Sequence, residues 1–221
     1  MGDRQLHLGL RHQELRRDER GRAYWEPVTE DASWPAAATG LLLCDVWDRH
    51  WSRGATERVE AMVGAMDRLV RAARDAGVQI VHAPSDTMDF YAGNPARQRV
   101  QEAAAAAPPR THGLPAWLAG ADAQLCDRLL PGGIDDAEAR RAYDPPLPVD
   151  AGDQGSDTGE TETHKAWSRQ HPGIGIDADR DGISDRGEEI YRFLRGRGVA
   201  HLLIMGVHTN MCVLGRSFAI R

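Results

Sequence analysis

The sequence predicts one α/β domain with three layers, in which helices cover both faces of a mostly parallel, open sheet. Three observations predict it. Short apolar runs suit strands buried on both faces, an amphipathic helical pattern stands between such runs, and glycines follow where the helices end. The 221 residues are enough for one domain that buries most of its apolar surface, and residues 1–221 are taken as that domain.

The first expected element is a peripheral hairpin within residues 1–37. Leu6, Leu8 and Leu10 alternate with other residues, and a second apolar group follows a charged stretch, so residues 5–34 are predicted to form two strands.

The sheet itself begins with Leu41 to Asp45, an apolar run that ends on a carboxylate. Residues 55–76 then follow a helical period and stop at Gly77, a residue favoured at helix C-caps. A second strand is expected over Val78 to His82. A helix from Asp185 to Arg195 and a strand from His201 to Gly206 repeat the pattern, as in βαβ units.

Residues 92–164 are different, because they hold an alanine run, several prolines and an acidic Gly/Asp/Thr stretch. Short helices are expected near 95–106 and 115–130, and the remainder is expected to be loop. A loop this long in a compact domain is usually functional or disordered, so this segment is interpreted as an insertion over the sheet.

Composition narrows the function classes. The chain has 27 basic and 33 acidic residues, and this balance argues against nucleic acid as the main partner. No apolar run approaches the roughly 18 residues of a membrane helix, and the charged N-terminus does not resemble a secretory signal. Three cysteines are too few for a disulfide framework. A cytoplasmic protein is expected, with no membrane partner and with a homo-oligomer left open.

Three segments stand where ligands bind in open α/β sheets, beyond the carboxyl ends of the strands. They follow Asp45, His82 and Gly206. In the third, Cys212 is expected at a helix N-terminus, which stabilises a thiolate and offers N–H groups to an oxyanion. The alternative is a small buried hydrophobe, which most free cysteines are.

Asp45 and Lys165 are further candidates. A carboxylate after apolar residues is costly to bury unless it is paired or working, although a strand-end Asp also caps turns. Lys165 stands among residues that favour order, and the alternative is a surface lysine.

The motifs LLLCD, HKAWSRQHP and GVHTNMCV, in this order, resemble those of the isochorismatase-like cysteine hydrolases, the superfamily of nicotinamidase and N-carbamoylsarcosine amidase. The resemblance covers roughly residues 38–91 and 163–221, and it implies a Rossmann-like fold with a triad of Cys212, Asp45 and Lys165. It also implies a non-proline cis peptide bond at Val207–His208. Isochorismatases that cleave an enol ether lack the cysteine, so Cys212 favours amide hydrolysis.

The expected reaction is cleavage of a carbon–nitrogen bond in a small-molecule amide through a thioester. Asp45 would move the proton, Lys165 would hold the charges, and backbone N–H groups of His208 and Cys212 would bind the oxyanion. Trp47, His50, Trp51 and His82 are expected to line the substrate pocket.

No cofactor is required by this reaction, but two segments could hold a divalent ion, zinc or calcium. Asp48 and His50 form an Asp-x-His pair, although not at the position where nicotinamidases carry one. Asp177, Asp179, Asp181 and Glu188 satisfy the spacing of an EF-hand loop, although no helix is expected to precede them. The alternative function is therefore a non-catalytic relative or a calcium-binding module, and the alternative reading of the loop is an acidic turn before a helix.

The resemblance also implies at least one more strand and helix after Cys212. The chain ends nine residues beyond it, so a C-terminally truncated fold that gains stability on extension is expected.

Overall fold

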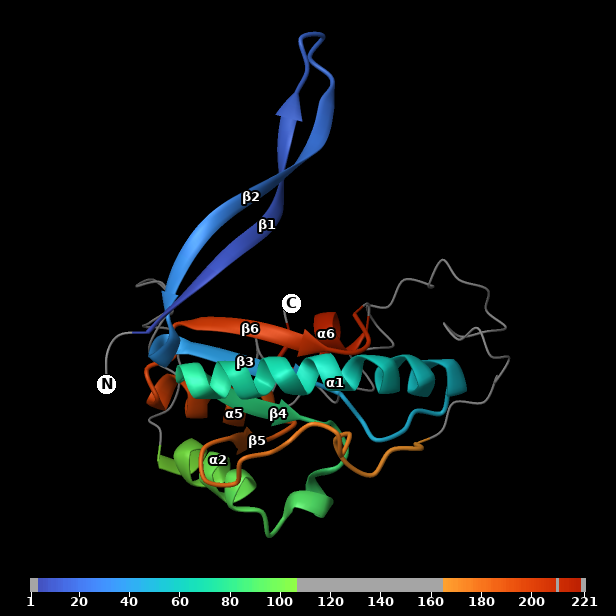
Figure 1. Cartoon of the computed structure of the whole chain (residues 1–221), viewed down its shortest axis with the longest axis vertical. Coiled ribbons are helices and arrows are strands. Elements are labelled where there is room, and N and C mark those ends of the chain that lie inside the picture. The colour runs from blue at the N-terminus through green and yellow to red at the C-terminus, as the bar shows by residue number, and fades with distance from the viewer. Residues whose placement is uncertain (1–3, 107–164, 210, 220–221) are drawn as a thin grey trace, which may run out of the picture.

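The computed structural model describes residues 4–106, 165–209 and 211–219. Within them, four parallel strands form one sheet in the order β5-β4-β3-β6, flanked by helices (Figure 1). The predicted α/β class is confirmed, whereas the helix predicted near 115–130 lies outside the described residues. The elements are β1 (Gln5–Arg17), β2 (Ala23–Pro35), a 3-10 turn (Ala36–Ala38), β3 (Thr39–Cys44), α1 (Arg53–Ala76), β4 (Gln79–Ala83), a second 3-10 turn (Met88–Tyr91), α2 (Pro95–Ala106), β5 (Gly182–Ile183), α5 (Gly187–Gly196), β6 (His201–Gly206) and α6 (Cys212–Gly215).

Strand β3 lies at the centre of the core, and all six of its residues are buried. Because side chains alternate along a strand, Leu41 and Leu43 pack with apolar residues of α1, while Leu42 packs on the opposite face with Phe193 of α5 and Val100 of α2. Helices therefore cover both faces of the sheet.

Helix α1 matches the predicted 55–76 to within two residues at its start. Ser52 caps its N-terminus by accepting a hydrogen bond from the Ala55 N–H, and Gly77 ends it with φ of 101°. This left-handed backbone favours glycine, so the predicted C-cap at Gly77 is confirmed.

Gly206 brings the end of β6 against the end of β3. It is paired with Cys44, and a Cβ on Gly206 would stand 2.1 Å from the Cys44 carbonyl oxygen. The ladder continues one residue further, since the Val207 N–H donates to the same oxygen at 3.0 Å. The segment that leads to Cys212 is thereby placed beside Asp45, which follows β3 directly.

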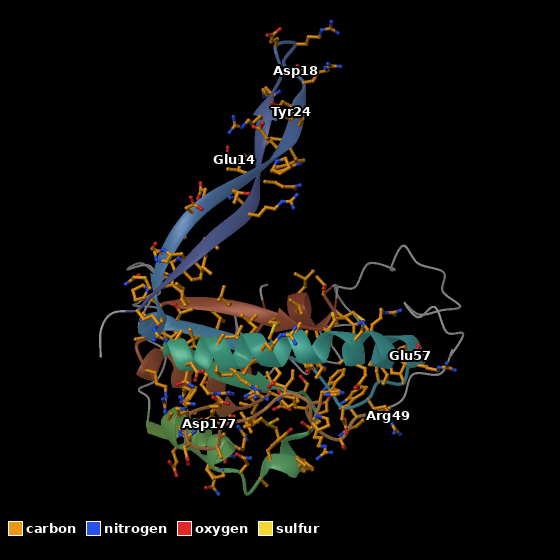
Figure 2. All side chains as sticks on the ribbon, in the orientation of Figure 1. Glu14, Asp18, Tyr24, Arg49, Glu57 and Asp177 are labelled. Atoms are coloured by element: carbon orange, nitrogen blue, oxygen red, sulfur yellow. The ribbon has the colours of Figure 1, made fainter. Side chains whose placement is uncertain are left out.

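The hairpin of β1 and β2 extends away from the sheet and helices (Figure 1). It is fixed at its base, where Trp34 stacks on His201 of β6 with ring centroids 4.5 Å apart. Side chains project from its outer half, and Trp25 there is 61% exposed (Figure 2). The two strands predicted over residues 5–34 are confirmed.

Among the described residues, no helix is both long enough and apolar enough to span a membrane.

Candidate functional site

The structure brings together two of the three predicted triad residues, Asp45 and Cys212, at the carboxyl end of the sheet. Asp45 has no exposed surface, and Cys212 is 7% exposed. The Cys212 thiol and the Asp45 carboxylate are hydrogen-bonded to each other. They come from the ends of adjacent strands, which explains how residues far apart in the sequence meet.

The Asp45 carboxylate is held by two donors. One oxygen accepts the Ser85 backbone N–H at 2.8 Å, and the other accepts the Nε–H of Arg216 at 2.7 Å. The backbone of Asp45 lies in the left-handed region with φ of 50°, which aspartate tolerates better than most residues. The turn after β3 therefore points this carboxylate into the protein, where burial would be costly without these donors.

Cys212 is a protonated thiol in this environment. Burial raises the pKa of Cys212 to about 12, and the neighbouring Asp45 charge and the hydrogen bond to it act in the same direction. The sequence had predicted the opposite, because a helix N-terminus was expected to stabilise the thiolate. That expectation is wrong: α6 is a single turn, so it supplies little dipole against the desolvation of a buried charge.

The backbone around His208 faces the sulfur. Its backbone hydrogen-bonds the Cys212 thiol, and the Val207–His208 peptide bond is cis, as the resemblance implies. Cys212 is the first residue of α6, so its own N–H is among those for which a helix has no intrahelical acceptor. Both N–H groups expected at an oxyanion hole thus belong to the segment from His208 to Cys212, which carries the candidate nucleophile.

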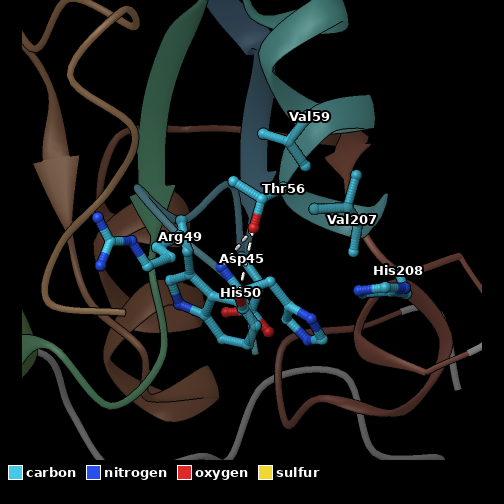
Figure 3. A pocket seen from close by; sticks show the side chains of 9 residues that line it. Asp45, Arg49, His50, Thr56, Val59, Val207 and His208 are labelled. Atoms are coloured by element: carbon cyan, nitrogen blue, oxygen red, sulfur yellow. Dashed lines mark hydrogen bonds between the residues drawn. The ribbon is translucent and has the colours of Figure 1, made fainter. Parts of the chain in front are cut away.

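A small hollow lies beside Asp45, with a cavity volume of about 10 Å³. Figure 3 shows His50 and His208, whose ring centroids are 4.9 Å apart, on the lower side of it and Val59 of α1 above. This volume is close to the space of one water molecule and far below the roughly 300 Å³ at which pockets for drug-sized ligands begin, so the hollow marks where the site opens and does not enclose a ligand. The lining residues are Asp45, Trp47, Arg49, His50, Ala55, Thr56, Val59, Val207 and His208.

Aromatic rings stack around Trp47 and His50, two of the residues that line the hollow. Trp47 stacks on Trp167 with centroids 4.0 Å apart, and His50 lies in ring contact with both and with Trp51. Of the predicted pocket residues, Trp47 and His50 line the hollow and Trp51 supports His50.

His82 is the exception among the predicted pocket residues. It is fully buried, with one ring nitrogen 2.8 Å from Gln170 Oε1 and the other 3.0 Å from Asp181 Oδ2. Its side chain lies on the same side of β4 as Ile80, the side that packs with α1, and from there it reaches Gln170 and Asp181. His82 does not line the hollow beside Asp45, because Gln170 and Asp181 engage both of its ring nitrogens on the buried side of β4.

The cation that contacts Asp45 is Arg216, which the sequence reasoning missed. A signal was present, since Arg216 stands four residues after Cys212 among apolar residues, and an arginine there must find a buried partner. Lys165 is exposed, and its Nζ donates to the Asp86 carbonyl oxygen. Asp86 directly follows Ser85, whose N–H bonds the Asp45 carboxylate, so Lys165 lies at the exposed edge of the site.

The predicted Asp48–His50 metal pair does not form a joint site. The Asp48 oxygens accept hydrogen bonds from the Ser168 N–H and hydroxyl and from the Arg169 N–H. His50 accepts the Ser52 N–H through Nδ1 at 3.0 Å. Asp48 therefore fastens the segment after Lys165 to the loop after β3, which leaves this carboxylate committed to protein donors.

The EF-hand spacing also leads to a different structure. The Asp181 carboxylate is buried and paired with Arg74 of α1 at 2.6 Å and with His82, while Asp177 pairs with Arg180. Glu188 lies on α5 and pairs with Arg192. Among the described residues, these four side chains do not bring three donor atoms within 4.8 Å of one another, and Asp181 instead links the start of β5 to α1 through Arg74.

In the described ranges, the group of His, Cys, Asp or Glu side chains whose donor atoms all lie within 4.8 Å is His12, Glu14 and Glu30 on the hairpin. Glu14 also pairs with Arg16 at 3.1 Å, and such exposed groups are common without an ion.

Comparison of the chain with protein-family models, with curated proteins and with solved structures gives no significant match.

Proposed function

We propose that this protein is a cysteine hydrolase that cleaves the carbon–nitrogen bond of a small amide. The observation that carries the proposal is the buried hydrogen bond between the Cys212 thiol and the Asp45 carboxylate beside a small hollow. A general base must lie within hydrogen-bond reach of the proton that it takes, and Asp45 meets this condition.

The reaction would begin with transfer of the thiol proton to Asp45 as the sulfur of Cys212 attacks the amide carbon. The new carbon–sulfur bond would leave negative charge on the carbonyl oxygen, for which the N–H groups of His208 and Cys212 are the candidate donors. Asp45 would return its proton to the nitrogen as the carbon–nitrogen bond breaks, and ammonia or an amine would leave.

Hydrolysis of the thioester would complete the cycle. Asp45 would accept a proton from water as the oxygen attacks the acyl carbon, and the carbon–sulfur bond would break to release the acid. The sulfur would then regain its proton from Asp45. Atoms and charge balance without a metal ion or redox cofactor, and a raised thiol pKa suits this cycle because the resting pair is thiol and carboxylate.

The test is release of ammonia from a panel of small primary amides by the purified chain. We expect Cys212→Ser to lower the turnover by at least about 1,000-fold while the melting temperature is kept. Hydroxylamine should intercept the acyl group on wild-type protein only.

Cys44→Ala is the matched control, because it removes another buried thiol that contacts the same core but has no part in the reaction. Ammonia release by Cys212→Ser at the wild-type rate would refute the proposal, as would loss of activity in Cys44→Ala with Cys212→Ser retaining it.

A further inference from the structure

Arg216 is a buried cation of the site for which the resemblance supplies no role. Its side chain is 3% exposed, and its Nε–H donates to Asp45 Oδ2 at 2.7 Å. The backbone N–H of Arg216 bonds to the Cys212 carbonyl at the end of α6. One helical turn therefore carries both the candidate nucleophile and the cation that holds its candidate base.

The guanidinium has more than one neighbour. It lies 5.8 Å from the ring centroid of Trp47, and one terminal nitrogen is 4.0 Å from Asp86 Oδ2. A planar guanidinium can bond one carboxylate and rest on an aromatic ring at once, which an ammonium cannot do equally well. The orientation of the Asp45 carboxylate is thus fixed from two sides, by Arg216 and by the Ser85 N–H.

Lys165 occupies a different place. Its exposed side chain donates to the backbone carbonyl of Asp86, whereas Arg216 donates to the carboxylate of Asp45. A charge at an exposed rim is screened by water and contributes less than one in a buried pair.

We propose that Arg216 is the positioning cation of this site, holding the Asp45 carboxylate against the Cys212 thiol in the role that the resemblance gives to Lys165. This inference rests on the proposed hydrolase function and adds a residue to it. Within residues 4–106, 165–209 and 211–219, the titratable and charged groups that face Asp45 and Cys212 are Cys44 of β3, Asp86 after β4, His208 before α6 and Arg216 after it.

The first experiment compares turnover of the best amide from the panel. Arg216→Gln is expected to lower kcat by at least about 100-fold with little change in KM, because the base loses its orientation in the transition state. Arg216→Lys should lose about tenfold, since an ammonium replaces the charge without the geometry. Lys165→Met should lose less than either variant.

Arg97→Gln is the control for loss of a buried ion pair. Arg97 pairs with Glu189, both are largely buried, and neither contacts the site. It should lower the melting temperature and leave kcat within about threefold of wild type, since surface and core changes away from a site act on stability.

The second experiment does not depend on hydrolysis. Iodoacetamide alkylation of Cys212 is followed at pH 8.5 by peptide mass spectrometry. Arg216→Gln should slow it at least about threefold, because the Asp45 charge then acts on the thiol unopposed and less thiolate forms.

These measurements separate the two proposals. If no amide is hydrolysed but Arg216→Gln slows alkylation, the hydrolase function fails and the role of Arg216 toward Asp45 and Cys212 stands. If amides are hydrolysed and folded Arg216→Gln keeps wild-type kcat, or Lys165→Met loses more, the role of Arg216 is overturned and the hydrolase function stands. Should Arg216→Gln not fold, Arg216→Lys decides, and wild-type kcat in that variant overturns the inference.

Discussion

Replacing Asp45 with asparagine is expected to make the Cys212 thiol easier to alkylate while amide hydrolysis is lost. The carboxylate raises the pKa of Cys212 through its charge and its hydrogen bond, after burial, which is the largest cause. Asparagine is similar in size and carries no charge, so the thiolate becomes less costly to form. The same change removes the proton acceptor on which the proposed reaction depends.

The size of the expected effect follows from the raised pKa of the buried Cys212 thiol. A rise from 9.0 to about 12 disfavours the thiolate by about 4 kcal/mol. At pH 7 the thiolate is then roughly one molecule in 100,000, against about one in 100 for a thiol at the reference value. Wild-type Cys212 should therefore react slowly at neutral pH, and its rate should rise about tenfold per pH unit through pH 10.

The assay is the second-order rate constant for iodoacetamide at each pH from 6 to 10, read for the Cys212 peptide. Asp45→Asn should raise this rate at pH 8 by at least about threefold, while burial keeps the pKa above the reference value. A wild-type profile that levels off below pH 8 would refute the assigned protonation state. Slower alkylation in Asp45→Asn would refute the role given to its charge.

Three further outcomes concern stability and ions. Burial alone would raise the pKa of Asp181, but hydrogen bonds from His82 and Arg74 outweigh burial and lower the pKa to about 2. Because this folded-state pKa lies below the unfolded-state pKa, the carboxylate stabilises the fold above about pH 4. That stability is lost as the pH falls toward about 2. Asp181→Asn should accordingly cost at least about 2 kcal/mol in urea unfolding at pH 7 and much less near pH 2, and a cost independent of pH would contradict this. Gly206→Ala should lower the melting temperature by at least about 5 °C because its Cβ would overlap the Cys44 carbonyl, whereas Gly196→Ala, with open space around it, should not. Millimolar calcium should leave the melting temperature unchanged to within about 1 °C, because an ion that bound the folded protein would raise it. A rise that depends on the calcium concentration would contradict this prediction and indicate a calcium site.

The α/β class could be predicted because it rests on local patterns. The apolar run at Leu41–Cys44 and the helical period that ends at Gly77 record burial and backbone conformation, which each segment carries in its own residues. Strand β5 was missed because two residues carry no periodicity, and Gly182–Ile183 forms a strand only where β4 offers an unpaired edge.

Ion sites were poorly predicted for a related reason. A spacing such as that from Asp177 to Glu188 shows that ligands could be offered, but a pairing partner far along the chain decides whether they are free. Arg74 of α1 pairs with the Asp181 carboxylate, and the residues near the loop in the sequence do not indicate this partner.

The sequence by itself determined the order of buried strands and helices and the residue types at the ends of β3 and β6, because burial and turn chemistry are written locally. Only the tertiary structure decided that Asp45 meets Cys212, that Arg216 and not Lys165 contacts Asp45, and that the thiol is protonated. These properties depend on distance and desolvation between segments that are remote in the chain, and both arise only when β3 and β6 pair and exclude water from their shared end.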